Sequence, residues 1–172
     1  MKKILFIAIT FLVIVSCEQQ KIGFVDNVDL INGYQEKIDT EEQLKSKIES
    51  FQKRTDSLRQ AFQLEINDAE IKARKMSQSA IQKLSKDLQD KEQVLSQRVQ
   101  FEQNQIAQES RSKNDSIVEK VKNFVKDYGE KNAYSYILGS NEAGSVMYGE
   151  ETSDLTQTIL DALNAEYKKE NE

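Results

Sequence analysis

The central part of the chain, residues 34–128, contains neither Gly nor Pro. Apolar side chains recur there at alternating intervals of four and three residues, which is the heptad spacing of a helix packed against another helix. The first such run comprises Leu44, Ile48, Phe51, Thr55, Leu58 and Phe62, with Thr55 as its weak member. The spacing returns at Ile117, Val121, Phe124 and Tyr128. This pattern predicts long packed helices rather than a globular core.

Between these two runs the apolar spacing is looser and the sequence more polar. One continuous helix over the whole stretch would be about 140 Å long, whereas a helix folded in half gives two segments of about 65–70 Å. Ser competes for backbone hydrogen bonds and tolerates turns, so the Ser-containing segment 76–79 is the predicted reversal. We therefore expect an antiparallel coiled-coil hairpin over residues 34–128, with its tip near residues 74–82.

The two ends of the chain carry strand-like patterns. In residues 21–26 apolar and other residues alternate, and residue types that favour strands are frequent. Asp26 or Asn27 can cap a short helix that follows. Beyond Gly129, residues 133–138 and 145–148 read as two strands joined by a hairpin loop at 141–144. A last helix is expected to follow. Thr152, Ser153 and Asp154 can cap its start. Its apolar face consists of Leu155, Ile159, Leu163 and Tyr167.

The predicted fold class is therefore α+β and mostly helical. Residues 17–33 and 129–172 build one small strand-containing body, and the long hairpin is inserted between them. Few Gly and no Pro in 172 residues agree with long helices, because turns draw on both residue types.

The first residues have the features of an export signal. Lys2 and Lys3 precede a run of apolar residues from Ile4 to Val15, which is too short to span a bilayer comfortably. The following Ile-Val-Ser-Cys resembles the lipobox of bacterial lipoproteins. We expect residues 1–16 to be removed as a lipoprotein signal peptide and Cys17 to carry lipid. The alternatives are an ordinary cleaved signal peptide with a chance Cys, or a retained membrane helix.

Charge is unevenly distributed in a chain with a net charge of −5. Between Ile71 and Lys86 there are five basic residues and no acidic one: Lys72, Arg74, Lys75, Lys83 and Lys86. At the tip of a hairpin they would form either a merely solvated helix face or a docking patch for anionic lipid or an acidic client.

Signs of enzyme chemistry are absent from the sequence. There is no His, which excludes Ser-His and Cys-His catalysis and His-based metal sites. The glycines form neither nucleotide-binding fingerprint. Asp26 and Asp29 are the best carboxylate pair, but helix capping explains them. We expect no enzymatic activity, no cofactor, no metal and no nucleic-acid partner.

The order of elements resembles one family. The strand at residues 21–26, the breaker-free helical stretch, and the ending Tyr136-Ile137-Leu138, Val146-Met147-Tyr148-Gly149 and Asp154-Leu155-Thr156 have the layout of OmpH/Skp periplasmic chaperones. The resemblance covers residues 20–168. It implies a homotrimer whose strands build a central barrel, with arms that hold unfolded outer-membrane proteins without ATP. The best-known member is basic and freely soluble, whereas this chain is acidic outside its arm tip and carries a lipobox.

The resemblance predicts a periplasmic protein, lipid-anchored to the outer membrane, that acts as a holdase. The alternative is a lipid-anchored coiled-coil spacer or envelope assembly scaffold without chaperone activity. The body has few apolar strand residues, so it is expected to need oligomerisation for stability. The expected trimer residues are Ile22, Phe24, Val25, Tyr136, Ile137, Leu138, Val146 and Tyr148.

Overall fold

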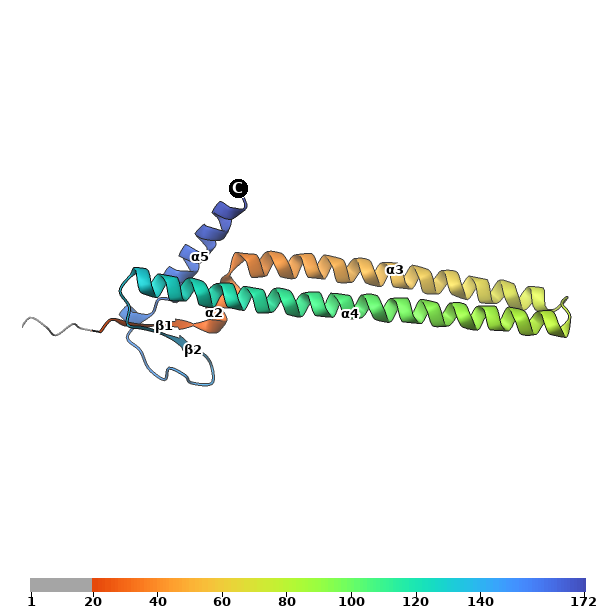
Figure 1. The fold of residues 1–172 in the computed structure, drawn as a ribbon, viewed down its shortest axis with the longest axis horizontal. Helices are drawn as coiled ribbons and strands as arrows, with labels where there is room; N and C mark the ends of the chain where they lie inside the picture. Colours follow the sequence, from red (N-terminus) through yellow and green to blue (C-terminus); the bar gives the residue numbers. More distant parts are fainter. Residues whose placement is uncertain (1–19) are drawn as a thin grey trace, which may run out of the picture. The chain divides into compact units, whose positions relative to one another are not determined.

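A computed structural model of the protein describes residues 20–172 (Figure 1). Mostly helical structure with one small sheet is confirmed. In chain order the elements are β1 (Ile22–Asp26), α2 (Asn27–Gly33), α3 (Gln35–Ala73), α4 (Gln78–Lys131), β2 (Tyr136–Ser140), a 3₁₀ turn (Glu151–Ser153) and α5 (Thr156–Glu170). The chain forms two compact units. We call residues 33–120 the arm unit, and the described residues 20–32 with 121–172 the body unit.

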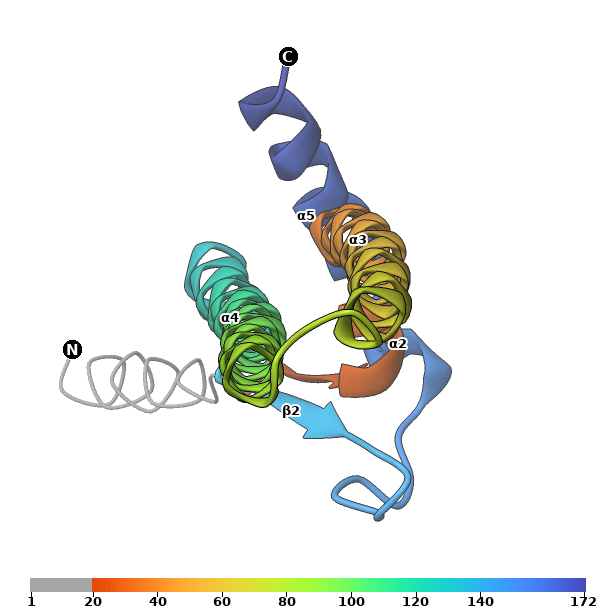
Figure 2. The ribbon, with the colours of Figure 1, turned by 90° about the vertical axis from the view of Figure 1, so that its right-hand side faces the viewer.

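The arm unit consists of two long helical segments that run antiparallel, side by side in Figures 1 and 2. Polar side chains join α3 to α4 at five levels, and the two residue numbers add up to 156 at every level. The partners are Glu36 with Lys120, Gln43 with Lys113, Lys47 with Glu109, Arg54 with Glu102, and Glu65 with Lys91. One register therefore holds over the whole arm unit, centred on residue 78.

The reversal between the helices is short. α3 ends at Ala73 and α4 begins at Gln78, so residues 74–77 make the turn and overlap the expected segment 76–79. The N–H groups of Lys75 and Met76 bond to the carbonyls of Lys72 and Ala73 at 3.1 Å each. Ser77 then opens α4, because its carbonyl accepts from Ile81 N–H at 3.0 Å. These bonds use the backbone groups that a helix end leaves without partners.

The interior of the arm unit is thin. Among the expected heptad positions Leu44 and Thr55 are buried, Phe51 is half-buried, and Ile48 is 41% exposed. The other buried positions of the arm unit are Tyr34, Thr40, Ala69, Ile106 and Ile117. Thr55, the weak member of the sequence pattern, is thus one of the few well-buried side chains. Small residues let the two helices approach closely but bury little apolar area.

The sheet of the body unit is parallel. β1 pairs with β2 in the register Ile22 to Tyr136 through Asp26 to Ser140. On its other edge β1 meets the chain again at Asp154, where Leu155 N–H donates to Phe24 O at 2.8 Å. Side chains alternate between two faces of a sheet. The inner face holds Gly23, Val25, Ile137 and Gly139, all buried or half-buried, and the outer face holds Ile22, Phe24, Tyr136 and Leu138.

The prediction of a hairpin between residues 133–138 and 145–148 was wrong. Residues 145–148 do not form a strand. β2 pairs instead with β1, and the two strands are parallel. The expected turn does form, with Gly144 N–H donating to Asn141 O at 2.9 Å. The chain after it follows a loop that brings Gly149 against the Phe24 ring, so close that a Cβ would lie 2.4 Å from that ring.

The first of these strands also starts later than predicted. α4 continues through Gly129 to Lys131, and its C-terminal turn occupies residues 132–135, with Ala133 at a φ of 55°. Tyr134 N–H donates to Gly129 O at 3.0 Å, which satisfies a carbonyl at the helix end. β2 therefore begins only at Tyr136.

The body core is small but closely packed. Leu30 and Ile159 are almost fully buried, together with Val25, Leu155 and Leu163. The expected caps are present: Asp26 Oδ1 accepts from the N–H groups of Val28 and Asp29 at 2.8 and 3.0 Å. Asp154 Oδ1 accepts from Thr156 N–H at 2.8 Å at the start of α5. Both carboxylates thus have structural roles at helix N-termini.

Candidate functional site

Four large apolar side chains of the arm unit point away from the seam between its helices. Leu64 and Ile71 on α3 are 67% and 62% exposed, and Val94 and Phe101 on α4 are 65% and 64% exposed. Members of each pair are seven residues apart, which places them on the same helix face two turns apart. We call these four residues the outward apolar positions. Isolated exposed apolar residues are common, but two stacked pairs on one slender arm offer contacts to a second chain.

Shallow hollows accompany the exposed apolar residues. One, of about 330 Å³, is lined by Asp90, Lys91, Val94, Leu95 and Arg98 on α4. A second, of about 280 Å³, lies along the seam and includes Leu44 and Ile48 with polar residues of both helices at its rim. An apolar floor with a charged rim suits weak contacts with many sequences better than recognition of one ligand.

The predicted basic cluster is at the end of the arm unit. Lys72 is in the last turn of α3, Arg74 and Lys75 are in the turn, and Lys83 and Lys86 are in the first turns of α4. Within residues 20–172 none of these five cations takes part in an ion pair. Met76 beside them is 40% exposed. The cluster therefore presents five cations without salt-bridge partners at the reversal.

The ion pairs of the arm unit shift two carboxylate pKa values. Burial raises the pKa of Glu36, but the hydrogen bonds from Lys120 Nζ and Tyr34 Oη and the charge of Lys120 outweigh it and hold the pKa below its usual 4.5. The Nζ of Lys120 lies 2.6 and 2.8 Å from the two Glu36 oxygens. The hydrogen bond from Lys47 lowers the pKa of Glu109, and the charges of Lys47 and Lys113 add to the effect. Both carboxylates favour the ionised form in the folded arm.

The expected trimer residues separate onto different parts of the body unit. Ile22, Tyr136 and Leu138 are exposed on the outer sheet face, with half-buried Phe24 among them. Val25 and Ile137 belong instead to the inner face, where Val25 is in the core. Tyr148 is 84% exposed in the loop after β2, and Val146 is half-buried there.

The expected signal peptide, residues 1–16, and Cys17 lie outside the described residues. Across residues 20–172, no helix combines the length and apolar character that crossing a bilayer requires. The same residues hold no group of three or more acidic or Cys side chains arranged to bind a metal ion.

A small α/β body and a long antiparallel helix pair with exposed apolar positions define a class of α+β proteins with a helical arm. Residues 21–163 match the family described as outer membrane protein (OmpH-like), so the chain belongs to the OmpH-like family. The recognition made from the element order is confirmed. Proteins of this family are periplasmic chaperones rather than enzymes.

The fold is shared with a solved structure. A protein of Caulobacter crescentus, assigned as an OmpH-like outer membrane chaperone, superposes with a TM-score of 0.75 at 16% identity, over 86% of this chain and 85% of that chain. At this identity the likeness concerns the fold alone. No curated protein matches the chain by sequence.

Sequence reasoning identified the tip cations but missed the outward apolar positions and the register of the helices. The signal for the outward apolar positions was present, because Leu64, Ile71, Val94 and Phe101 fall outside the heptad seam at intervals of seven. Glu65 and Glu102 are ion-pair partners of Lys91 and Arg54 on the facing helix. Charge pairing could be recognised only once the register was known.

Proposed function

We propose that the protein is an ATP-independent periplasmic holdase that binds unfolded outer-membrane proteins along its arms. Membership of the OmpH-like family and the fold shared with an OmpH-like protein support a chaperone role. The observation that carries the proposal is the pair of outward apolar faces, Leu64 with Ile71 and Val94 with Phe101, on an arm with few buried residues. Weak apolar contacts spread over a long surface suit clients of varied sequence.

The working form is proposed to be a homotrimer assembled through the body unit. The outer sheet face exposes Ile22, Tyr136 and Leu138, and β2 is an edge strand of a two-stranded sheet. Exposed apolar strands with a free edge favour pairing with another chain. Sedimentation of the lipid-free protein at micromolar concentration tests the assembly, and a folded monomer would contradict it.

Lipidation of Cys17 is proposed to hold the trimer at the outer membrane. The support is the lipobox-like Ile14-Val15-Ser16-Cys17 after a short apolar run. In a fractionation, C17A should release the protein from membranes, since residue 17 could no longer carry the lipid. Unchanged membrane retention would count against the anchor.

The five tip cations are proposed to contact anionic lipid or acidic client segments in a salt-sensitive way. Each basic residue near an anionic surface is worth about 1 kcal/mol in a favourable case, screened beyond about 8 Å in physiological salt. Changing Lys72, Arg74, Lys75, Lys83 and Lys86 to Gln should weaken binding to phosphatidylglycerol vesicles at low salt. The matched control changes five exposed arm cations elsewhere: Lys45, Lys53, Arg59, Arg98 and Arg111. Equal binding of both variants would mean that the tip only confers solubility.

A lipid-anchored spacer or envelope scaffold is the second candidate. The observation that favours it is the continuous register of five polar pairs, which suits an arm that bridges a distance. Light scattering separates the two functions. A holdase keeps a denatured β-barrel protein from aggregating at stoichiometric ratios without ATP, whereas a spacer leaves its aggregation unchanged.

A further inference from the structure

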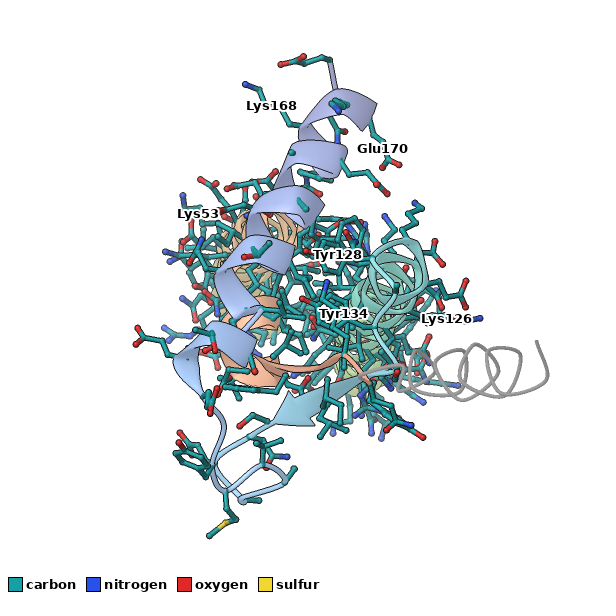
Figure 3. The ribbon with its side chains drawn as sticks, turned by 90° about the vertical axis from the view of Figure 1, so that its left-hand side faces the viewer. Lys53, Lys126, Tyr128, Tyr134, Lys168 and Glu170 are labelled. Atoms are coloured by element: carbon teal, nitrogen blue, oxygen red, sulfur yellow. The ribbon has the colours of Figure 1, made fainter. Side chains whose placement is uncertain are left out.

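The polar pairs between α3 and α4 lie on one side of the arm unit. Their members on α3 are 7, 4, 7 and 11 residues apart, and those on α4 are 11, 7, 4 and 7 residues apart. These intervals are close to whole numbers of helical turns, so the pair members form one line along each helix. The outer edges of the helices face away from each other, and Lys53 lies on the outer edge of α3 in Figure 3, where the arm is seen end-on. We call the side of the seam that carries the pairs the paired side, and the opposite side the open side.

The paired side is polar where it is hollowed. A hollow of about 460 Å³ there contains the ion-pair partners Lys47 and Glu109, and its other lining residues are Gln105, Gln108 and Ser112. An apolar side chain that entered this hollow would take Lys47 and Glu109 out of water, which costs free energy. The paired side is therefore a poor surface for an apolar chain.

The open side has an apolar floor over the same stretch of the arm. Its hollow of about 280 Å³ includes Leu44 and Ile48, each of which directly follows a pair member in the sequence. One residue turns a helix by about 100°. Leu44 is buried, so this turn leads through the seam to the open side, where Ile48 is 41% exposed and Ile38, about three turns earlier, is 43% exposed. Farther along the seam Phe51 and Leu58 are only half-buried and extend the floor.

The α4 wall of the open side is uncharged over a long distance. Ser110 and Asn114 line the hollow from α4, and residues three and four apart share a helix face. The series that ends at these two residues holds only amide, hydroxyl and Ala side chains: Gln93, Ser96, Gln100, Gln103, Ala107, Ser110 and Asn114. It covers 21 residue steps, or about 32 Å. Absence of charge, rather than the identity of each side chain, defines this wall.

The charged residues of the open-side hollow are confined to its other rim. Glu41, Lys45 and Glu49 line the hollow, and all three belong to α3. A chain that lies along the α4 wall can therefore bring apolar side chains to the floor without desolvating a charge on α4.

The length of the uncharged wall matches one strand of an outer-membrane β-barrel. A transmembrane β-strand has about 9–11 residues, and ten extended residues cover about 33 Å. Alternate side chains of such a strand are apolar, so a strand that has not yet entered its barrel presents about five of them on one side. The hollow of about 280 Å³ is smaller than the sites of about 300–1,000 Å³ that bind small molecules, which favours single side chains as its occupants.

We propose that the open side of the arm holds one unfolded transmembrane-strand segment of a client. The apolar side chains of the segment lie on the floor that includes Leu44 and Ile48, and its polar side chains face water. This inference rests on the proposed holdase function and deepens it, because it assigns the client to one side of the arm and sets the length of the bound segment. The outward apolar positions then contact neighbouring segments of the same client.

Photo-crosslinking from matched positions tests which side holds the client. In the full-length protein, p-benzoylphenylalanine replaces Gln100 or Asn114 on the open side, or Gln105 or Ser112 on the paired side; all four positions are exposed. Each protein is irradiated with a denatured β-barrel protein. We expect several-fold higher yields of client adduct from the open side. Equal yields, or higher yields from the paired side, would overturn the proposal. Open-side adducts with a second copy of the chain in place of the client would also overturn it, since that side would then be an assembly surface.

Added charges test the role of the uncharged wall. A107E/N114E places two carboxylates on the wall, seven residues apart, without touching the floor. Q105E/S112E is the matched control, with the same two charges at the same spacing on the paired side. Arm melting is measured in parallel, and Glu is a good helix former at all four positions. We expect A107E/N114E to bind the client several-fold more weakly and the control to bind it as the wild type does. Equal binding by the two variants would overturn the role of the wall.

Peptide competition tests the kind of segment that is bound. A ten-residue peptide in which apolar and polar residues alternate should compete with the client for crosslinking from position 114. A peptide of the same composition with its apolar residues in one block should compete several-fold less. Equal competition would overturn the assignment of a strand segment.

Light scattering separates this inference from the holdase proposal. A protein that neither prevents aggregation of the denatured β-barrel protein nor crosslinks to it would overturn both. A protein that prevents aggregation but crosslinks equally from both sides would overturn the open-side assignment alone.

Discussion

The arm unit and the body unit are held together by different means. The arm unit buries few side chains and defines its register by polar pairs at five levels between α3 and α4. The body unit is shorter in every element, but it encloses Leu30 and Ile159 almost completely and brings Gly23, Gly139 and Gly149 into very close contacts. Charge pattern specifies alignment in the arm, whereas steric fit specifies it in the body. The arm can therefore leave apolar side chains exposed for the proposed client binding, while the body core stays closely packed.

The largest effect is expected in the body core. I159A removes a fully buried side chain, and such truncations cost about 2–5 kcal/mol. Hydrogen exchange should rise throughout α5 and the sheet, while residues 40–110 of the arm unit keep their protection. The control is M147A, at a position 90% exposed, which should change neither unit. Equal loss of protection in the arm would show that the two units are not independently stabilised.

A smaller effect in the same unit tests the close contacts. A Cβ at Gly23 would lie 2.5 Å from Leu155 Cδ1 and 3.1 Å from the Tyr134 ring, so G23A should cost about 1–3 kcal/mol of overpacking. G129A is the matched control, because a Cβ there meets only the flexible end of Ile137 at 3.3 Å and lies in a helix that favours Ala. Urea denaturation followed by Tyr fluorescence measures both. If the two variants were equally stable, packing at Gly23 would not be limiting.

Acidification should loosen the arm unit. The pKa values of Glu36 and Glu109 are lowered in the folded state, so their contribution to stability is present above the unfolded value near 4.5 and is lost as pH falls through the folded values. Thermal unfolding followed by circular dichroism should therefore show a lower midpoint at pH 3 than at pH 7. E36Q/E109Q should show a smaller decrease over the same range. An identical decrease in that variant would mean that other carboxylates control the response.

The smallest effect concerns a single ion pair. R54E places two carboxylates opposite each other at Glu102 and should cost up to about 1 kcal/mol. The charge-swapped double variant R54E/E102R should recover most of that loss, because the register remains unchanged. Chemical denaturation of the wild type, R54E, E102R and the double variant gives the coupling free energy. No recovery in the double variant would indicate that charge pairing does not specify the alignment of α3 and α4.

The sequence predicted what depends on local pattern. The absence of Gly and Pro over residues 34–128 indicated the helices, Ser77 and Ser79 marked the reversal, and Asp26 and Asp154 marked helix starts. The wrongly predicted feature, the hairpin with residues 145–148, depends on which strands pair with each other. The alternation at residues 145–148 is typical of a strand, but Phe24 is engaged by Gly149 and Asp154, and β2 takes the other edge of β1 in parallel. Such pairings are set by tertiary contacts and leave no local signal.

The candidate sites show the same division. The tip cations could be located from the run of basic residues and from the position of the predicted reversal. The register of β1 was needed to show that Val25 and Ile22 lie on opposite faces of the sheet. To identify the outward apolar positions, one must know which side of each helix faces the seam. The apolar spacing between the two heptad runs of residues 34–128 is too loose to show this. Patterns along the chain thus located the arm, and the fold was needed to say which side of it is open.

Holdase assays on an outward-face variant test the central claim most directly. L64Q/I71Q/V94Q/F101Q removes the outward apolar positions without touching the seam, and Q60A/Q89A/Q97A/Q103A changes four exposed arm positions as a control. Light scattering of a denatured β-barrel protein is recorded without ATP at equal molar ratios, with arm melting measured in parallel. The account predicts several-fold weaker protection by the first variant, wild-type protection by the control, and unchanged melting of both. Full protection by L64Q/I71Q/V94Q/F101Q would contradict it.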